Sequence, residues 1–255
     1  MKLTKQTPIM KTRLFYGLSL LMLMFATSCN FTERVTVKDD GSGQMSLEVD
    51  ASQLMAMAGD EMAKEGEERK DSTFTFKEIL DEKRDSIAKL PKEDQERLKK
   101  LENFKVHMMM DPKTSEFKMD IFTDFKKAED ITDIMQAFSE LNKMNRSGAA
   151  QSGMNLEKKE SDVKYFYDGK KFVKTIKAGK SKEEEKSDED AATEEMMKSM
   201  FEESTYTVIY EFPKPVKSVS DKSAVISDDK KKVTVTYSLL DYFDKPEDMG
   251  LEVKF

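Results

Sequence analysis

The stretch "RVTVKDDGSGQMSLEVD", residues 34–50, alternates apolar and polar residues on both sides of a turn-forming segment at 40–43. In a β-strand, side chains two residues apart point to the same face, and Asp-Gly favours a tight turn. We therefore predict a β-hairpin with one apolar face. That face carries Val35 and Val37 on the first strand and Met45, Leu47 and Val49 on the second.

The same alternation recurs along the chain. It predicts a second hairpin from Phe104 to Ile121 around the turn at 111–114, and a third from Val163 to Ile176 around Asp168-Gly169. Near the end of the chain, four further segments are rich in β-branched and aromatic residues and are separated by proline or aspartate. We expect strands at 205–212, 224–227, 232–240 and 251–255.

Helical spacing of apolar residues occurs between these strands. We expect a helix over 52–70 with Ser52 as its N-cap, and helices over 76–101 that restart at Pro91. A short helix with Met196, Met197, Met200 and Phe201 is expected before the last strands. The clearest amphipathic stripe predicts a core helix that opens near Asp124 or Asp130; its members are Ile131, Ile134, Met135, Phe138 and Leu141.

These elements predict an α+β fold, with an antiparallel sheet of about eight to ten strands in hairpins and several helices packed on one side. Residues 29–177 form the N-terminal part of the domain and include a helical insertion. Residues 178–195 are acidic, contain nothing apolar larger than alanine, and are expected to be a disordered linker. Residues 196–255 are the C-terminal, β-rich part of the same domain.

Residues 1–28 have the order of a signal peptide. Four basic residues precede a 12-residue apolar run from Leu14 to Phe25, which is followed by small residues and then Cys29. A spanning helix needs about 20 apolar residues, so this run is too short to serve as one. An ordinary secretory signal with a cysteine placed by chance at the cleavage site is the alternative.

Cys29 is the single cysteine of the chain. Ala26-Thr27-Ser28-Cys29 resembles the bacterial lipobox, in which a peptidase cuts before a cysteine that carries diacylglycerol and is then acylated on its new amino group. The resemblance implies that Cys29 is the lipidation site and the membrane anchor, since several acyl chains together hold a protein to a bilayer far longer than one. Palmitate incorporation at Cys29 is expected.

Charge argues against nucleic-acid partners. Removing residues 1–28 takes four basic and no acidic residues from the 43 and 50 of the chain, which leaves 39 against 50, a formal charge of −11. Nucleic-acid binding requires a basic face, and no basic stripe interleaved with aromatic residues is present in the sequence.

A lipidated Cys29 leaves no free thiol for a disulfide, so the stability of the fold has to come from packing.

The sequence offers no clear catalytic or metal-binding constellation. His107 is the single histidine, and alternation places it opposite the apolar face of its strand, toward solvent. No zinc spacing and no serine or cysteine nucleophile with a base is present, and we expect no cofactor and no metal. Copper held by His107, Met108, Met109 and Met110 is disfavoured because these side chains alternate between two faces. A hydrolase based on two carboxylates stays open.

The chain contains 19 methionines. Methionine fills cores adaptably and also lines surfaces that bind varied apolar partners. Two interpretations follow: the methionine-bearing helices line a pliable apolar groove, or they only fill the core. The residues concerned are Met55, Met62, Met196, Met197 and Met200.

Cys29, the strand at 35–37, the turn at 40–43 and the late β-rich section with Phe212-Pro213 resemble bacterial lipoproteins with an LppM-like domain. The resemblance covers the two ends of the mature chain. It implies a membrane-tethered α+β domain and, for some members, an affinity for envelope lipids; many of them end in a transmembrane helix, which this chain lacks.

We expect a cell-envelope lipoprotein that is not an enzyme and binds a lipid-like ligand or a partner protein. The alternative is a carboxylate-based hydrolase acting on envelope polymers. Asn30, rather than aspartate, after the lipidated cysteine favours the outer membrane over the inner one.

Overall fold

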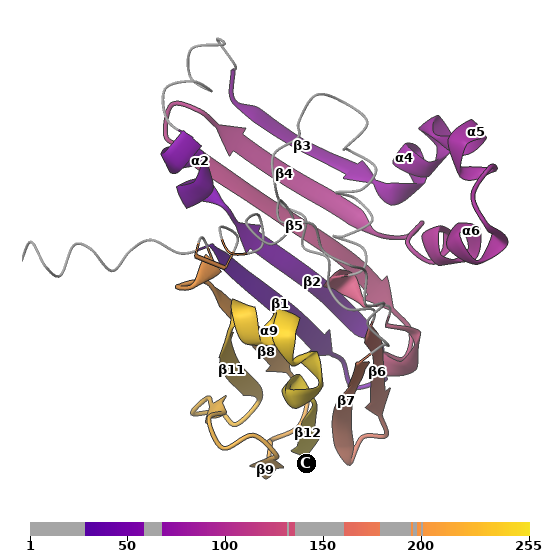
Figure 1. Ribbon diagram of the computed structural model, residues 1–255. Coiled ribbons are helices and arrows are strands. Elements are labelled where there is room, and N and C mark those ends of the chain that lie inside the picture. Colours follow the sequence, from indigo (N-terminus) through magenta and orange to yellow (C-terminus); the bar gives the residue numbers. More distant parts are fainter. Residues whose placement is uncertain are drawn as a thin grey trace, which may run out of the picture.

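The structure, a computed structural model, describes residues 29–58, 68–131, 133–135, 161–178, 195, 198–199 and 201–255. Within these residues the protein is an α+β fold with mostly antiparallel strands, as predicted. The strands divide between two sheets, whereas the sequence indicated one. Figure 1 shows the larger sheet running diagonally behind the smaller one.

The larger sheet has eight strands in the order β10-β11-β8-β1-β2-β5-β4-β3. The predicted hairpins are confirmed as β1–β2 and β4–β5. β1 is also paired in parallel with β8, so the N-terminal and C-terminal parts of the chain share this sheet. Its strands are β1 (Asn30–Val37), β2 (Gly43–Asp50), β3 (Lys70–Thr75), β4 (Lys105–Asp111), β5 (Glu116–Phe125), β8 (Thr205–Glu211), β10 (Val225–Ile226) and β11 (Lys232–Ser238).

The smaller sheet has four strands in the order β6-β7-β12-β9. The third predicted hairpin is confirmed as β6 (Ser161–Tyr167) and β7 (Lys171–Ala178), and the predicted C-terminal strand as β12 (Leu251–Lys254). β9 (Ser218–Val219), which the sequence did not indicate, pairs with β12. The predicted turns are built as expected, since Gly41 and Gly169 have φ of 82° and 76°, where glycine is favoured.

The hydrophobic core lies between the two sheets. Phe31 and Val35 of β1, Phe172 of β7 and Val253 of β12 are at most 1% exposed. Burial alternates along β1 and β2, as expected for strands with one face in a core. The core therefore holds β1, at the middle of the large sheet, against the small sheet.

The helices lie at the periphery. The predicted helical insertion is present as α4 (Phe76–Glu82), α5 (Arg84–Ile87) and α6 (Lys92–Lys99). The helix predicted to restart at Pro91 starts one residue later, with Pro91 as its N-cap. Thr75 caps α4 with a capping box. Of the helix predicted over 52–70, α2 (Ser52–Ala58) lies in the described residues. Residues 68–69 are not helical and β3 starts at Lys70, so the helix does not extend to its predicted end.

Of the two predicted openings of the core helix, Asp124 is excluded because β5 continues to Phe125 and the short 3-10 helix η2 (Ala128–Asp130) follows. The described helical residues 134–135 come after Asp130, the other predicted opening. One strand boundary was wrong. The strand predicted to 240 ends at Ser238, whose side chain caps α9 (Leu239–Asp244). A serine cap satisfies a free N–H of the first turn and so favours the helix over further extension. A second 3-10 helix, η3 (Pro246–Met249), leads to β12.

The expected acidic linker falls largely outside the described residues, as do Phe138, Leu141, Met62, Met196, Met197 and Met200. Ile131, Ile134 and Met135 of the predicted amphipathic stripe are buried. None of the helices among the described residues has the length and hydropathy to cross a membrane.

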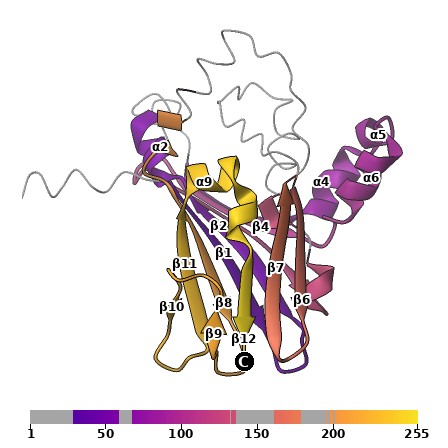
Figure 2. The ribbon, with the colours of Figure 1, turned by 60° about the horizontal axis from the view of Figure 1, so that its bottom comes forward.

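The parallel pairing of β1 and β8 shows which segments lie at each end of the domain. β1 starts beside the start of β8, and both run the same way, with Asn30 opposite Thr205 and Thr36 opposite Glu211. The start of β1 and the segment that follows β8 therefore lie at opposite ends. Figure 2 shows this arrangement, with α2 and α9 at one end and β9 and the C-terminus at the other.

Candidate functional site

An open groove of about 970 Å³ lies at the end of the domain that follows β8. Its walls come from the segment after β8, the loop after β10, the β6–β7 turn and the C-terminal residue. The lining combines lysine ammonium groups and apolar surface with one acidic side chain, that of Asp228. It consists of Gly169, Lys214, Pro215, Val216, Lys217, Ile226, Ser227, Asp228, Lys230 and Phe255.

Backbone hydrogen bonds fix these walls in place. The N–H of Val216 donates to the carbonyl of Lys230 at 2.7 Å, and that of Lys217 donates to the carbonyl of Lys254 at 2.8 Å. Lys230 has φ of 59°, a conformation unfavourable for a residue with a side chain. Its own N–H donates to the carbonyl of Ser227 at 2.8 Å. The turn that presents Lys230 is thus held from both sides.

The groove lysines are available to a ligand to different degrees. Lys214 Nζ donates to the carbonyl of Gly169 at 2.9 Å, which leaves two of its three protons for other acceptors. Lys217 and Lys230 are exposed. Ile226, 38% exposed, and Phe255 add apolar surface beside these charges. The groove can accept a molecule that has an anionic group and an apolar part.

A second polar cluster is buried between the sheets. Glu33 of β1 and Lys174 of β7 form an ion pair at 2.8 Å, with both side chains 2% exposed. Three tyrosine hydroxyls also donate to the Glu33 carboxylate: Tyr165 at 3.1 Å, Tyr210 at 2.6 Å, and Tyr206. With all its lone pairs facing donors, this carboxylate joins the two sheets through charge-assisted hydrogen bonds.

The buried cluster shifts the ionisation of its members. Burial raises the pKa of Glu33, but the charge of Lys174 and the donated hydrogen bonds outweigh it, so the pKa lies below the usual value. Burial, reinforced by the Glu33 charge, raises the pKa of Tyr165, Tyr206 and Tyr210 well above that of free tyrosine. The tyrosines therefore stay neutral donors, and the cluster has the character of a structural ion pair.

A third cluster lies on the opposite face of the large sheet. Glu48 of β2 stands opposite Asp120 of β5, which stands opposite His107 of β4. Desolvation, followed by repulsion from Glu48, raises the pKa of Asp120. His107 is 45% exposed, as predicted, and its Nε2 lies 2.9 Å from Asp71 Oδ1. Among the described residues, no group of three or more histidine, cysteine or acidic side chains is arranged to hold a metal ion.

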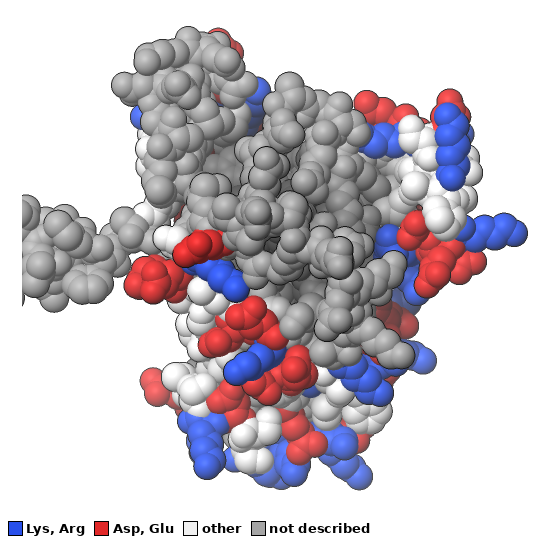
Figure 3. Space-filling view, viewed as in Figure 1, with Lys and Arg blue, Asp and Glu red and all other residues white. Residues whose placement is uncertain are grey.

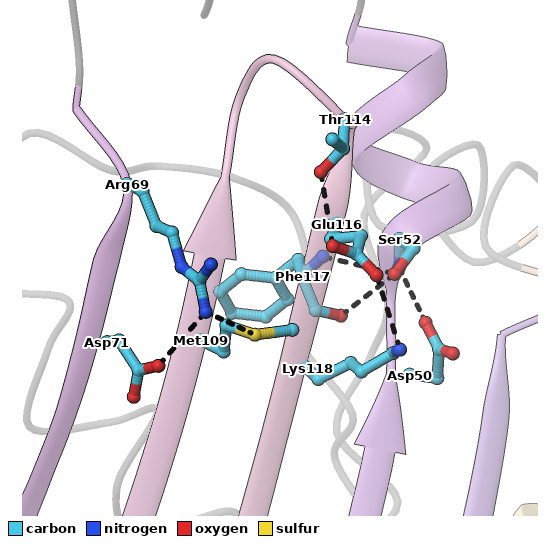
Figure 4. Close-up of polar contacts among 9 residues, drawn as sticks. All are labelled: Asp50, Ser52, Arg69, Asp71, Met109, Thr114, Glu116, Phe117 and Lys118. Atoms are coloured by element: carbon cyan, nitrogen blue, oxygen red, sulfur yellow. Dashed lines mark hydrogen bonds and ion pairs between the residues drawn. The ribbon is translucent and has the colours of Figure 1, made fainter.

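The methionines of β4 do not form a common ligand set. Met109 Sδ lies 3.7 Å from an Arg69 guanidinium nitrogen, which also binds Asp71 (Figure 4). Met108 faces the other side, because successive residues of a strand alternate. In the same view Ser52, at the start of α2, bonds the backbone of Phe117 and so attaches α2 to β5. Met55 of α2 is 8% exposed, as core filler would be.

Cys29, the predicted lipidation site, directly precedes β1. Its side chain is 5% exposed in the 255-residue chain, whereas the predicted cleavage would make it the new N-terminus. Asn30 already belongs to the sheet, and its Oδ1 accepts a hydrogen bond from Thr205 Oγ1 at 2.8 Å. No linker therefore separates the predicted anchor from the sheet.

Neither the groove nor the buried cluster was recognised in the sequence. A signal for the cluster did exist: Glu33 is in phase with Val35 and Val37, and Lys174 is in phase with Phe172 and Ile176. A charge at an inward position on each of two strands indicates a buried pair. The groove had no such signal, because its lysines come from loops whose proximity depends on the pairing of β9 and β12.

A scan against protein-family models finds no match. A search of curated proteins finds none either. Among solved structures, the chain is similar to the NMR structure of the folded domain of the LppM protein of Mycobacterium tuberculosis, with 10% identity, 90% of this chain and 91% of that chain covered, and a TM-score of 0.31. The resemblance stated from the sequence is thus matched by a weak structural similarity.

Proposed function

We propose that this protein is a cell-envelope lipoprotein, anchored through Cys29, that binds an anionic lipid-like ligand without catalysis. The observation that carries the proposal is the groove. Its lysines at 214, 217 and 230 stand beside apolar surface from Val216, Ile226 and Phe255. Binding sites for small molecules characteristically combine an apolar lining with a few placed polar groups.

The groove chemistry suits an amphiphile with a phosphate or carboxylate headgroup. Lysine is a common ligand for phosphate, and its ammonium interacts as a point charge. The apolar surface beside it would contact the adjoining acyl or glyceryl portion. A partner protein is the other ligand expected from the sequence, and it would bind the same lysines through acidic side chains.

Calorimetric titration of the full chain with short-chain phosphatidylglycerol below its micellar concentration tests the proposal. Wild-type protein is expected to bind, and the double variant Lys217→Glu/Lys230→Glu to bind at least about thirtyfold more weakly, because each basic side chain near an anionic lipid contributes about 1 kcal/mol. Lys89→Glu, an exposed charge reversal in the helical insertion, is the control for a reversal outside the groove. Equal binding by all three proteins, or none by wild type, overturns the proposal.

The anchor is tested separately. Cells grown with radiolabelled palmitate are expected to label the wild-type protein and not the Cys29→Ala variant. Persistent labelling of Cys29→Ala would remove the lipoprotein part of the proposal. Fractionation of the labelled protein then tests the expected outer-membrane location.

A carboxylate-based hydrolase is the second candidate, and one observation favours it. Desolvation, followed by repulsion from the opposing Glu48, raises the pKa of Asp120, and a carboxyl group with a raised pKa beside a second carboxylate is an arrangement that general acids use. Neither residue lines the groove. Release of reducing sugar from envelope polymers by wild type, lost in both Asp120→Asn and Glu48→Gln, would favour this function over simple binding.

A further inference from the structure

The groove and the predicted anchor lie at opposite ends of the domain. β1 begins at Asn30, next to Cys29, and is eight residues long. At about 3.3 Å per residue it spans about 26 Å. The groove lies beyond the last residues of β8, which runs parallel to β1. The lysines are therefore at least about 25 Å from the attachment point.

The connection between the predicted lipid anchor at Cys29 and the large sheet contains no linker. Cys29 is followed at once by a strand that is paired on both sides, with β2 and with β8. A tether without a flexible linker restricts how far the domain can turn toward its own bilayer, in contrast to the coil of a glycine- or serine-rich linker.

Both ends of the domain carry exposed charge. The end of β11 nearest Asn30 is followed by the carboxylates of α9 and η3, whereas the groove end carries its lysines together with exposed carboxylates at 39, 40, 168, 228 and 229. Figure 3 shows red side chains around α9 and η3 and blue ones along the lower edge, where β9, β12 and the β6–β7 hairpin end. The carboxylates of α9 and η3 are Asp241, Asp244, Glu247 and Asp248, against Lys245.

Ionic screening weakens the attraction between the groove lysines and the anchoring bilayer at this distance. The Debye length is about 8 Å at physiological ionic strength, so lysines about 25 Å away lie roughly three screening lengths from the anchoring bilayer. They feel little attraction to its headgroups. The carboxylates of α9 and η3 lie nearer to it and are repelled by anionic lipid. Neither interaction draws the groove toward the anchoring surface.

We propose that the groove binds anionic phospholipid headgroups presented by a second bilayer surface facing the anchored one, so that the protein holds lipid in trans. This inference rests on the proposed function, because it assigns the source of the ligand for the same groove. It also predicts that anionic lipid in the anchoring bilayer does not occupy the groove.

Reconstitution tests the inference. The palmitate-labelled full-length product is extracted from membranes and inserted into phosphatidylcholine vesicles. Fluorescent acceptor vesicles that contain phosphatidylglycerol are then added, and co-sedimentation with the donor vesicles is measured. Acceptors of phosphatidylcholine alone are the lipid control, and donors carrying Lys89→Glu are the protein control.

Capture of phosphatidylglycerol acceptors is expected for wild type and Lys89→Glu. Capture should fall about thirtyfold for Lys217→Glu/Lys230→Glu, the loss expected for two basic contacts to anionic lipid. Capture unaffected by that double variant overturns the inference. So does inhibition of capture when phosphatidylglycerol is present in the donor bilayer as well as in the acceptors, at a salt concentration that screens repulsion between the vesicles, since the groove would then be filled in cis.

Short-chain phosphatidylglycerol separates this inference from the proposed function. If the short-chain lipid binds to the reconstituted protein but acceptor vesicles are not captured, the trans inference is wrong and the proposed function stands. If the short-chain lipid does not bind, the proposed function fails, and the trans inference fails with it.

Discussion

Replacing Lys174 by methionine should destabilise the domain far more than replacing an exposed lysine. Methionine keeps the unbranched stem of lysine but removes the ammonium, which donates to both oxygens of Glu33 at 2.9 and 2.8 Å. The Glu33 carboxylate, 2% exposed, would keep its tyrosine donors and lose its counter-charge. Breaking a buried pair in this way costs about 3–5 kcal/mol.

The three tyrosine donors place the expected loss near the lower end of that range. A loss of about 3 kcal/mol lowers the melting temperature of a domain of this size by about 6–12 °C. Urea unfolding followed by circular dichroism gives the free energy directly. Lys164→Met, on the neighbouring strand, is the matched control: Lys164 is 68% exposed in its pair with Asp162, and its loss should change stability by less than about 1 kcal/mol.

A second variant distinguishes the buried charge from lost packing. Glu33→Gln/Lys174→Met removes both charges and keeps an amide oxygen that the tyrosines can donate to. It should be more stable than Lys174→Met alone, because no unpaired charge remains buried. If Lys174→Met costs less than about 1 kcal/mol, or if the double variant is no more stable than the single one, the interpretation of the pair is wrong.

Three further changes have defined outcomes. Folding lowers the pKa of Glu33, so the ionised carboxylate stabilises the fold above its unfolded pKa near 4.3, and this stabilisation is lost as the pH falls through the folded pKa. The free energy of unfolding, measured from pH 7 to pH 2, should therefore fall less steeply with acid for Glu33→Gln than for wild type. Asp120 has a raised pKa, so its ionisation opposes folding at neutral pH; Asp120→Asn should stabilise by a fraction of a kcal/mol at pH 7, and a gain that persists below about pH 3.9 would contradict this. A Cβ on Gly43 would lie 2.0 Å from the carbonyl oxygen of Thr36 and 2.4 Å from Phe125, so Gly43→Ala should lower the melting temperature in calorimetry. Gly250→Ala, whose Cβ would approach no atom closer than 3.4 Å, serves for comparison, and an unchanged melting temperature for Gly43→Ala would refute the contact.

Local pattern predicted much of this fold. The three hairpins follow from alternation with short-range turn chemistry, and the turn glycines at 41 and 169 have the positive φ that such turns require. These features depend on residues close in sequence. The parallel pairing of β1 with β8 does not, since it joins residues about 175 positions apart, and no local signal specifies it.

The strand β3, the buried pair and the groove were not predicted, because each lacks a local sequence pattern or depends on residues far apart in the chain. β3 was missed because its residues are mostly exposed and polar, so it lacks the alternation that marks a half-buried strand. Glu33 and Lys174 could have been found by extending the inward phase of their strands. The groove depends on the placement of loops around β9 and the C-terminus, which sequence spacing does not give.

The proposed function requires that the lysine groove hold an anionic lipid. Native mass spectrometry of the gently extracted full-length protein, with organic extraction of whatever accompanies it, tests this most directly. We expect a reproducible non-covalent mass that extracts as an anionic lipid from wild type and Lys89→Glu and is absent from Lys217→Glu/Lys230→Glu. A clean mass for wild type, or the same lipid retained by the double variant, would contradict it.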